Sequence, residues 1–466
     1  MDFNSALYTD LYQITMAQSY FNHGKHNKKA TFDYFFRKNP FNSGYVLFCG
    51  LEQLLDWLEE VHFSEEDLYY LKQQGFQNDF LEYLKGFSFN GSILSVEEGQ
   101  VVFPFAPILT VEASIVECQI IETFLLNILN FQSLIATKAS RVRYIAGDHA
   151  ILAEFGLRRS QGYAGILASR ASFIGGFNST SNVLAGKSFE VPIGGTMSHA
   201  FIQSYDNELS AFMAYAETFP DNCTLLVDTY NTLKSGLPNA IKVAKALSEN
   251  GQQLAAIRLD SGDLAYLSKQ ARKMLDAAGY PEVKIAASNQ LDEHVIRSLK
   301  EQEAEIDIFG VGTNLVVGRE NGALDGVYKL CSFDGDPRIK ISENLKKMNF
   351  PGSKELYRYS NNHGQIIADA ISTKGEPAPP SMAHPFEPHK TMALDSDNSQ
   401  SILKMAMTNG KRITQRTSAK EIANQASKNL KLLPNEHRRF DNPHVYKVGI
   451  SKTLEQLRDQ LKNERK

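Results

Sequence analysis

Residues 254–288 read LAAIRLDSGDLAYLSKQARKMLDAAGYPEVKIAAS, and this stretch contains the pattern that decides the fold. Its two ends, 254–260 and 283–288, are short apolar runs without strict alternation, which is typical of strands buried on both faces. Between them, residues 264–278 carry apolar side chains at helical spacing, and Gly279 and Pro281 follow as stop signals. Strand, helix and strand in this order predict a βαβ unit and a parallel sheet.

Apolar runs of the same kind recur on both sides of this stretch, at 150–155, 224–228, 306–312 and 326–330. Together they predict an α/β fold with a parallel sheet. Polar residues and glycines follow most of the runs, where parallel sheets and barrels place their active sites. They are Glu154 with Arg158 and Arg159, then Asp228, then Arg258 and Asp260, then Ser288 and Asn289, and finally Gly310, Gly312 and Thr313. Any one of these groups is compatible with an ordinary solvated loop, but five in succession favour a functional site.

The rest of the chain predicts additional structure around this region. A chain of 466 residues is expected to form more than one domain. Amphipathic helices are predicted at 51–61 and 64–76, and a β-rich stretch at 91–111, so the N-terminal part is expected to be a separate α+β domain. The tail from Leu430 onward, which ends in a charged helix, is expected to pack back on it. We therefore expect domains at 1–140, 141–350 and 351–466.

Composition excludes several classes of protein. The net charge is −4 and no basic block stands out, which argues against binding to nucleic acid or to an anionic membrane. The four cysteines are far apart and form no C-x-x-C pair, which argues against a zinc site or a disulfide framework. No apolar run approaches the roughly 20 residues that a membrane-spanning helix needs, and the first residues do not resemble a signal peptide. A cytoplasmic protein is expected.

The segment VPIGGTMSHAF, residues 191–201, combines a flexible backbone with reactive side chains. Gly194 and Gly195 allow the main chain to approach a ligand closely and to present its N–H groups to an anion. Thr196 can donate or accept a hydrogen bond, and His199 can act as nucleophile, base or phosphate partner. Taken alone, a histidine beside glycines is also compatible with an ordinary loop.

Two strand-to-helix turns have the composition of phosphate sites. The sequence RLDSGD offers Arg258 and two carboxylates, Asp260 and Asp263, which suits a diphosphate carrying Mg²⁺ or the hydroxyls of a ribose. The alternative is that Asp260 or Ser261 merely caps the helix. The turn FGVGT can surround a terminal phosphate with main-chain donors, although a simple tight turn explains it almost as well.

Two further segments carry rings. In EFGLRR, Phe155 can stack on a planar base while Arg158 and Arg159 pair with carboxylate or diphosphate. Alternatively, Glu154 pairs with one of these arginines on the surface. Tyr12 lies at the entry to an amphipathic helix and by itself suggests a packing residue.

Eight segments together resemble the nicotinate phosphoribosyltransferases, in the order found in that family and over essentially the whole chain. They are TDLYQ (9–13), FFRKNPF (35–41), EFGLRRSQG (154–162), GGFNSTSNVLAG (175–186), GTMSHAF (195–201), DTYNTLKSGLPNA (228–240), RLDSGDL (258–264) and the tail LPNEHRRFDNPHVYKVGIS (433–451). The GVGT turn belongs to the same likeness. The resemblance implies a type II phosphoribosyltransferase fold, in which an irregular α/β barrel is joined to an α+β domain built from N-terminal and C-terminal segments. It also implies a homodimer with shared active sites.

The resemblance further implies an activity. Members of the family join nicotinate to 5-phosphoribosyl 1-pyrophosphate, which gives nicotinate mononucleotide and pyrophosphate for NAD biosynthesis by salvage. ATP is a co-substrate that phosphorylates the histidine matched by His199, and Mg²⁺ accompanies the phosphorylated substrates. Asp260 or Asp263 is the carboxylate that we expect near that Mg²⁺.

Individual roles follow from the same resemblance. Arg258 matches the cation near the nicotinate carboxylate and the ribose, with Arg158 as a second candidate, and Asp260 matches the carboxylate that binds the ribose hydroxyls. Thr196 matches a residue that contacts nicotinate. Phe155 and Tyr12 match the two rings that sandwich the pyridine, with Tyr12 coming from the partner subunit. Gly312 and Thr313 match the turn that holds the 5′-phosphate.

Alternative functions differ from this one in recognisable features. Nicotinamide phosphoribosyltransferases share R-x-D-S-G-D but differ around the histidine, where this chain has G-T-x-x-H. Quinolinate phosphoribosyltransferases are shorter, need extra cations and lack the phosphohistidine. A non-catalytic ligand-binding barrel would keep the fold without the chemistry, and a barrel aldolase or isomerase would need a Schiff-base lysine or a positioned carboxylate base at a strand end. The nicotinate enzyme is favoured.

Overall fold

The computed structural model describes residues 4–343 and 347–464. The chain divides into two compact units. Unit 1 comprises Met1–Thr137 and Ala323–Lys466, and unit 2 comprises Lys138–Gly322. The first boundary falls within the long helix α6 (Glu122–Ala146), and the second follows Gly322. No helix among the described residues is long and apolar enough to cross a membrane.

Unit 2 is built on a six-stranded sheet in which every described strand pair is parallel. The order is β7 (Ser179–Thr180), β6 (Ile151–Glu154), β11 (Ile308–Val311), β10 (Lys284–Ser288), β9 (Ala256–Leu259) and β8 (Thr224–Leu226). The predicted α/β fold is therefore confirmed. Residues 192–194 form an isolated parallel bridge with Thr180 on the outer side of β7, and within the described part of the chain no strand pairing joins this side to β8. The hydrogen-bonded ring is therefore incomplete and the barrel is irregular.

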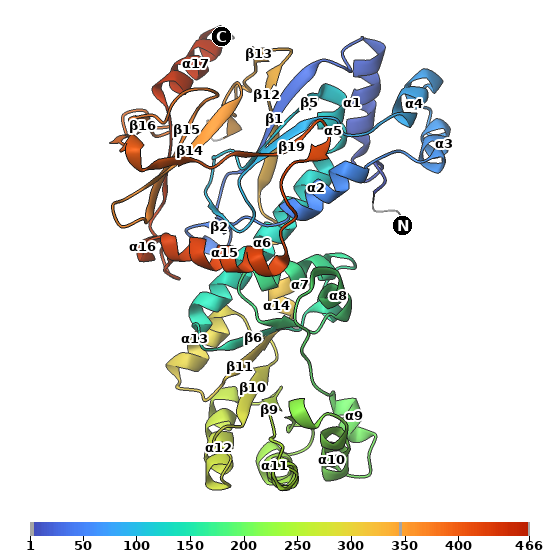
Figure 1. Ribbon diagram of the computed structural model, residues 1–466, viewed down its shortest axis with the longest axis vertical. Helices are drawn as coiled ribbons and strands as arrows, with labels where there is room; N and C mark the ends of the chain where they lie inside the picture. Colours follow the sequence, from blue (N-terminus) through green and yellow to red (C-terminus); the bar gives the residue numbers. More distant parts are fainter. Residues whose placement is uncertain (1–3, 344–346, 465–466) are drawn as a thin grey trace. The chain divides into compact units, whose positions relative to one another are not determined.

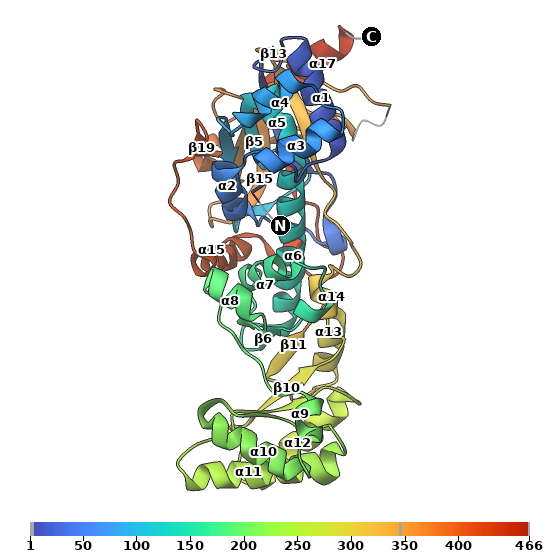
Figure 2. The same cartoon turned by 90° about the vertical axis from the view of Figure 1, so that its right-hand side faces the viewer.

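Helices that connect the strands bury the apolar surface of this sheet. Figures 1 and 2 both show α10 (Glu208–Thr218), α11 (Leu237–Glu249) and α12 (Leu264–Ala277) side by side in unit 2. Their apolar faces form one core cluster with β8, β9 and β10. The predicted helix at 264–278 is α12, which begins after Asp263, whose side chain accepts from the Tyr266 N–H, and ends before Gly279 at φ 88°. Glycine suits that stop because it adopts positive φ at no steric cost.

Unit 1 is assembled from both ends of the chain, as the resemblance implied. Its seven-stranded antiparallel sheet has the order β13-β12-β1-β5-β3-β19-β20, and its second sheet has the order β17-β16-β21-β15-β14-β18. The first sheet contains β1 (Lys29–Phe36), β3 (Ser92–Ser95), β5 (Leu109–Ser114), β12 (Gly326–Phe333), β13 (Asp336–Pro337), β19 (Lys404–Thr408) and β20 (Lys411–Arg412). The second contains β14 (Lys354–Ser360), β15 (Ile366–Thr373), β16 (Ser381–Ala383), β17 (Thr391–Ala393), β18 (Ser399–Ser401) and β21 (Lys447–Ile450).

The helices predicted at 51–61 and 64–76 are α2 (Leu51–Glu60) and α3 (Glu65–Gln73) of unit 1. The other helices of this unit include α1 (Leu11–Asn22), α4 (Asn78–Lys85), α5 (Ile115–Ile120), α15 (Ala419–Leu432), α16 (Asn435–Arg438) and the charged C-terminal helix α17 (Lys452–Asn463). Helix α3 begins with a capping box, in which the Ser64 hydroxyl accepts from the Asp67 N–H and the Asp67 carboxylate accepts from the Ser64 N–H. This exchange satisfies two of the free N–H groups at the helix start.

The prediction that residues 326–330 belong to the parallel sheet is wrong. They form part of β12, which pairs antiparallel with β1 in unit 1, and the rings of Phe32 and Tyr328 stack at 4.6 Å between the two strands. A short apolar run predicts a buried strand but does not specify its partner. The expected barrel domain of 141–350 accordingly differs from unit 2, which ends at Gly322.

Candidate active site

The carboxyl ends of four neighbouring strands of unit 2 lie along one edge of the sheet. In the parallel register, Glu154 pairs with Val311, Gly310 with Ser288, and Ala287 with Leu259. The residues that follow these positions therefore emerge together. This edge is where α/β sheets and barrels build their sites.

An arginine, a carboxylate and a hydroxyl form the centre of the site. The Arg258 guanidinium donates from Nη2 to Asp260 Oδ1 at 2.8 Å and from Nε to Ser288 Oγ at 2.9 Å, and the Ser288 hydroxyl donates in turn to Asp260 Oδ1. The Arg258 side chain is 14% exposed and that of Asp260 is 28% exposed, so solvent only partly screens the pair. The three side chains hold one another in a single geometry.

This environment keeps Asp260 ionised. Burial alone would raise the pKa of the Asp260 carboxyl, but the hydrogen bond from Ser288 and the charge of Arg258 outweigh it and hold that pKa below its ordinary value. The second oxygen, Asp260 Oδ2, lies 3.8 Å from His199 Nε2. Asp260 therefore offers an acceptor at neutral pH.

A second carboxylate, Asp228, supports the first. Its Oδ2 accepts from the Asp260 N–H at 2.9 Å and from the Ser261 hydroxyl at 2.6 Å, while its Oδ1 is buried and has no partner within the described structure. The sequence placed Asp228 at a strand end but did not single it out as a site residue. The alternative that Asp260 or Ser261 caps the next helix is wrong, because Asp263 is the N-cap of α12.

His199 opens the short helix α9 (His199–Gln203) with both ring nitrogens directed at polar partners. Nδ1 shares a hydrogen bond with Thr229 Oγ1 at 3.0 Å, and Nε2 faces Asp260. The His199 side chain is 41% exposed, so a ligand can reach it. Thr196 turns its hydroxyl to the main chain, where it donates to the Thr224 carbonyl at 2.9 Å and accepts from the Met197 N–H at 2.6 Å.

Phe155 provides a half-buried ring at the same edge. The Arg258 guanidinium carbon lies 5.5 Å from the centre of this ring. Gly310 leaves room for the ring, since a Cβ on Gly310 would lie 2.6 Å from Phe155 ring carbons. Gly312 passes close to the same residue, because a Cβ there would lie 3.0 Å from the Phe155 carbonyl oxygen. The two glycines of the GVGT turn are thus required by Phe155.

Glu154 is a buried anchor for this turn. Its Oε2 accepts from the Ser169 hydroxyl at 2.9 Å and from the Thr180 hydroxyl at 2.6 Å, and its Oε1 accepts from the Gly156 N–H. The alternative that Glu154 pairs with a neighbouring arginine on the surface is wrong, since Glu154 is buried whereas Arg158 and Arg159 are exposed.

The structure thus brings Phe155, His199, Arg258 and Asp260 together around one strand edge. Thr313 follows Gly312 at the start of α14 (Thr313–Val316) and is partly exposed. Tyr12 belongs to unit 1, on α1, and is half exposed. Among the described residues, no group of three or more histidines, cysteines and carboxylates could hold a metal ion.

A cavity of about 850 Å³ lies in unit 1 and does not coincide with this cluster. Its lining includes Arg37, Phe105 and His384, but none of the site residues predicted from the sequence. The strand edge of unit 2 is the stronger candidate site, because charged and ring side chains converge there in a defined geometry, whereas cavity size alone specifies no reaction.

The fold and the site define the class of protein. A parallel, irregular α/β barrel that gathers a histidine, an Arg–Asp pair and a glycine-rich turn, joined to an α+β unit built from both chain ends, is that of a type II phosphoribosyltransferase. Residues 7–130, 151–368 and 353–458 match the nicotinate phosphoribosyltransferase N-terminal domain, family and C-terminal domain. The chain belongs to the nicotinate phosphoribosyltransferase family.

Full-length relatives agree with this assignment. The chain is 46% identical to the nicotinate phosphoribosyltransferase of Bacillus subtilis, covering 97% of this chain and 94% of that one. It is 38% identical to that of Caenorhabditis elegans, with 97% and 92% covered. The crystal structure of human nicotinic acid phosphoribosyltransferase superposes with a TM-score of 0.88 at 31% identity, with 97% of this chain and 99% of that one covered.

Proposed function

We propose that this protein forms nicotinate mononucleotide and pyrophosphate from nicotinate and 5-phosphoribosyl 1-pyrophosphate, with ATP hydrolysis coupled through a phosphohistidine at His199. The product would enter NAD biosynthesis by salvage. One observation carries the proposal: a ring, a guanidinium, an ionised carboxylate and a histidine share one strand edge, with Asp260 in contact with Arg258 and 3.8 Å from His199. Each matches a group that the two substrates require.

The pyridine ring would lie against Phe155, with its carboxylate directed toward Arg258. An aromatic face stacks on a flat ring, and a guanidinium pairs with a carboxylate more strongly than a neutral group does. Arg258 can contact the carboxylate of a pyridine stacked on Phe155, because its guanidinium carbon lies 5.5 Å from the centre of the Phe155 ring. Thr196 is a further nicotinate contact, Arg158 is a second candidate for the carboxylate, and Tyr12 of a partner subunit would cover the other face of the pyridine.

The ribose and its phosphates would occupy the remaining turns. Asp260 would accept hydrogen bonds from the ribose hydroxyls, and Gly312 with Thr313 would hold the 5′-phosphate through main-chain and hydroxyl donors. The bond from the ribose C1 to the pyrophosphate oxygen breaks, and the pyridine nitrogen donates the electron pair of the new bond to C1. Cations that neutralise the leaving group, together with fixed orientation of the two reactants, would supply most of the rate enhancement.

Mg²⁺ fits this site as a companion of the diphosphate rather than as a resident ion. Asp228 offers a buried oxygen without a partner in the described structure, and Asp260 is held in its ionised form. These two carboxylates would face the ion, whereas Asp263 is already engaged in capping α12. When bound, Mg²⁺ would neutralise the charge that develops on the leaving pyrophosphate.

His199 would accept the terminal phosphoryl group of ATP. A ring nitrogen forms the new bond to phosphorus while the bond to the ADP oxygen breaks, and water later hydrolyses the phosphohistidine. Thr229, at 3.0 Å from Nδ1, fixes the orientation of the ring. Partial exposure of the side chain is compatible with access of a nucleotide.

Asp260→Asn is expected to lower kcat/KM by about 10²-fold, because the variant loses a charged acceptor at the reacting sugar. The pKa of Asp260 is depressed, so its charge is complete above the ordinary carboxyl pKa of about 4 and is lost only as the pH falls below that value. The loss in Asp260→Asn should therefore be equal at pH 5.5 and pH 7.5 in initial-rate assays. A loss that shrinks severalfold at pH 5.5 would contradict the ionised state assigned to this carboxyl.

Gly310→Ala is expected to raise the KM for nicotinate by about tenfold, which corresponds to about 1.4 kcal/mol, because the new methyl would displace the Phe155 ring. The KM for phosphoribosyl pyrophosphate should change less than threefold. Gly322→Ala is the matched control, since a Cβ at Gly322 meets nothing within 4 Å. Steady-state kinetics with each substrate varied in turn tests this prediction. An unchanged nicotinate KM would contradict the proposed contact between Phe155 and the pyridine ring.

The proposed reaction is tested by mass-detected formation of nicotinate mononucleotide from nicotinate and phosphoribosyl pyrophosphate, with and without ATP. Nicotinamide is assayed in parallel. The expected result is product from nicotinate that ATP stimulates, with little product from nicotinamide. Equal or greater turnover of nicotinamide would favour the nicotinamide enzyme, and binding of nicotinate without turnover would favour a non-catalytic barrel.

A further inference from the structure

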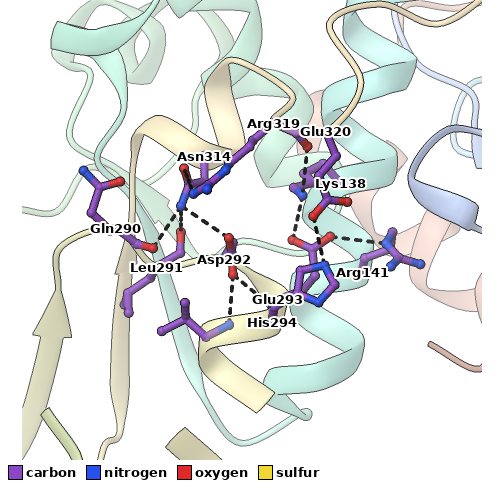
Figure 3. A network of polar contacts seen from close by, with 11 residues as sticks. Lys138, Arg141, Gln290, Leu291, Asp292, Glu293, His294, Asn314, Arg319 and Glu320 are labelled. Atoms are coloured by element: carbon purple, nitrogen blue, oxygen red, sulfur yellow. Dashed lines mark hydrogen bonds and ion pairs between the residues drawn. The ribbon is translucent and has the colours of Figure 1, made fainter. Parts of the chain in front are cut away.

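A network of polar side chains lies directly beside the strand-edge turns of unit 2, and the reaction described above does not use it (Figure 3). Its buried members are Lys138 and Arg141 on α6, Asp292 and Glu293 at the start of α13 (Glu293–Glu301), and Asn314 on α14. Burying so many polar groups is costly unless each is paired. The network therefore calls for an explanation.

Asn314 is the residue that joins its parts. The side-chain Nδ2 donates to the Gln290 carbonyl at 2.9 Å and to the Leu291 carbonyl at 3.3 Å, and it lies 3.4 Å from Asp292 Oδ2. The side-chain Oδ1 accepts from Arg319 Nη1 at 3.2 Å. Both ends of this amide, which is 3% exposed, are thus engaged. Only an amide supplies donors and an acceptor in this arrangement.

The turn that Asn314 contacts has an unfavourable backbone. Asn289 and Gln290 have φ values of 88° and 52°, in the left-handed region that residues other than glycine rarely adopt. Such conformations persist where the surroundings hold them, and they cluster at functional sites. Asn314 binds the carbonyl of Gln290, and Asp292 accepts from the His294 and Val295 N–H groups at 3.0 and 2.9 Å on the other side of the turn.

This turn is adjacent to the proposed phosphate turn. It begins immediately after Ser288, which contacts Arg258 and Asp260, and Ser288 pairs with Gly310 in the parallel register. Asn314 itself follows Gly312 and Thr313 directly. One side chain therefore connects the turn after β10 with the turn after β11.

The network is anchored by a buried ion pair. Glu293 lies 2.9 Å from Lys138 Nζ and 3.3 Å from Arg141 Nε, and the side chains of Lys138 and Glu293 are fully buried. Lys138 also donates to the Arg319 carbonyl at 3.2 Å, while the Arg319 N–H donates to the Asn314 carbonyl at 3.1 Å. The start of α13 and the segment after α14 are thereby tied to α6.

We propose that Asn314 is a positioning residue, which holds the turns after β10 and β11 in the relative geometry that binds the 5′-phosphate of the phosphoribosyl substrate. The inference rests on the proposed role of Gly312 and Thr313. The ligand class is a phosphate monoester on a sugar, and Asn314 acts on it only through the main chain of the two turns.

The test is Asn314→Asp, which keeps the shape of the side chain but removes both amide donors. Asn314→Ala is the uncharged second variant, which separates loss of the donors from the effect of a new negative charge near a phosphate. Each is expected to raise the KM for phosphoribosyl pyrophosphate by about tenfold, with the KM for nicotinate changed less than threefold. Because KM does not depend on the fraction of active enzyme, a partly unfolded preparation still gives a decisive value.

Asn250→Asp is the matched control. Asn250 also donates from its amide to a main-chain carbonyl, that of Ala246 at 3.2 Å, but it is exposed at the end of α11, and its variant should keep both KM values. A lower melting temperature or kcat in the Asn314 variants, with an unchanged KM for phosphoribosyl pyrophosphate, would show a purely structural role and overturn the proposal. An inactive unaltered protein would instead overturn the proposed function itself.

Discussion

His199→Ala is expected to abolish coupled ATP hydrolysis while the protein stays folded. The variant lacks the atom that accepts the phosphoryl group, so ATP hydrolysis in the presence of both substrates should fall by about a thousandfold, as is usual when a reacting group is removed. Formation of nicotinate mononucleotide without ATP should persist near its unstimulated rate, because Arg258, Asp260 and Phe155 remain in place. The His199 side chain is 41% exposed, so its truncation should leave the melting temperature within a few degrees of that of the unaltered protein.

The measurement records ADP and nicotinate mononucleotide in the same reaction, so that the ratio of the two is obtained directly. His149→Ala is the control, since His149 is an exposed histidine of the same unit, and its ratio should be that of the unaltered protein. If His199→Ala hydrolysed ATP in step with product at the normal ratio, the phosphohistidine would have to be elsewhere.

Arg258→Lys is expected to lower kcat/KM for nicotinate by about 10²- to 10³-fold, because lysine cannot reproduce a planar fork that serves Asp260, Ser288 and a substrate carboxylate together. Turnover of nicotinamide, which lacks the carboxylate, should fall less. The ratio of kcat/KM for nicotinate to kcat/KM for nicotinamide therefore tests the role of Arg258 more specifically than either value alone. We expect this ratio to drop by about tenfold or more, equivalent to about 1.4 kcal/mol.

Competition assays with both pyridines in one mixture measure this preference directly. Arg297→Lys is the control, because Arg297 lies on the partly exposed face of α13, where it is 3.8 Å from Glu301. If the preference for nicotinate were unchanged in Arg258→Lys but fell strongly in Arg158→Lys, the residue that binds the nicotinate carboxylate would be Arg158.

The parts of the fold predicted from the sequence are those encoded locally. The unit β9-α12-β10 was predicted because its strands, its helix and its stop signal lie within 35 consecutive residues, 254–288. The strand β12 was misplaced because its partner β1 lies about 300 positions earlier, and no local pattern specifies so remote a pairing. The two-residue strand β7 is too short to show any period.

The candidate site follows the same rule. The convergence of strand-end residues such as Asp260 and Gly310 could be predicted, because parallel strands bring their carboxyl ends together wherever they lie in the sequence. The role of Glu154 as a buried anchor was missed, since its partners Ser169 and Thr180 come from other elements. The role proposed for Asn314 could not be predicted, because it depends on hydrogen bonds to carbonyls of a turn that only the folded chain brings near.

The central claim is that one strand edge of unit 2 binds the pyridine, the ribose and the phosphate. A crystal structure with bound nicotinate mononucleotide tests it most directly. The account predicts the pyridine on Phe155 with its carboxylate toward Arg258, the ribose hydroxyls on Asp260 and the phosphate at Gly312–Thr313. A nucleotide bound in the cavity of unit 1, away from these residues, would contradict it.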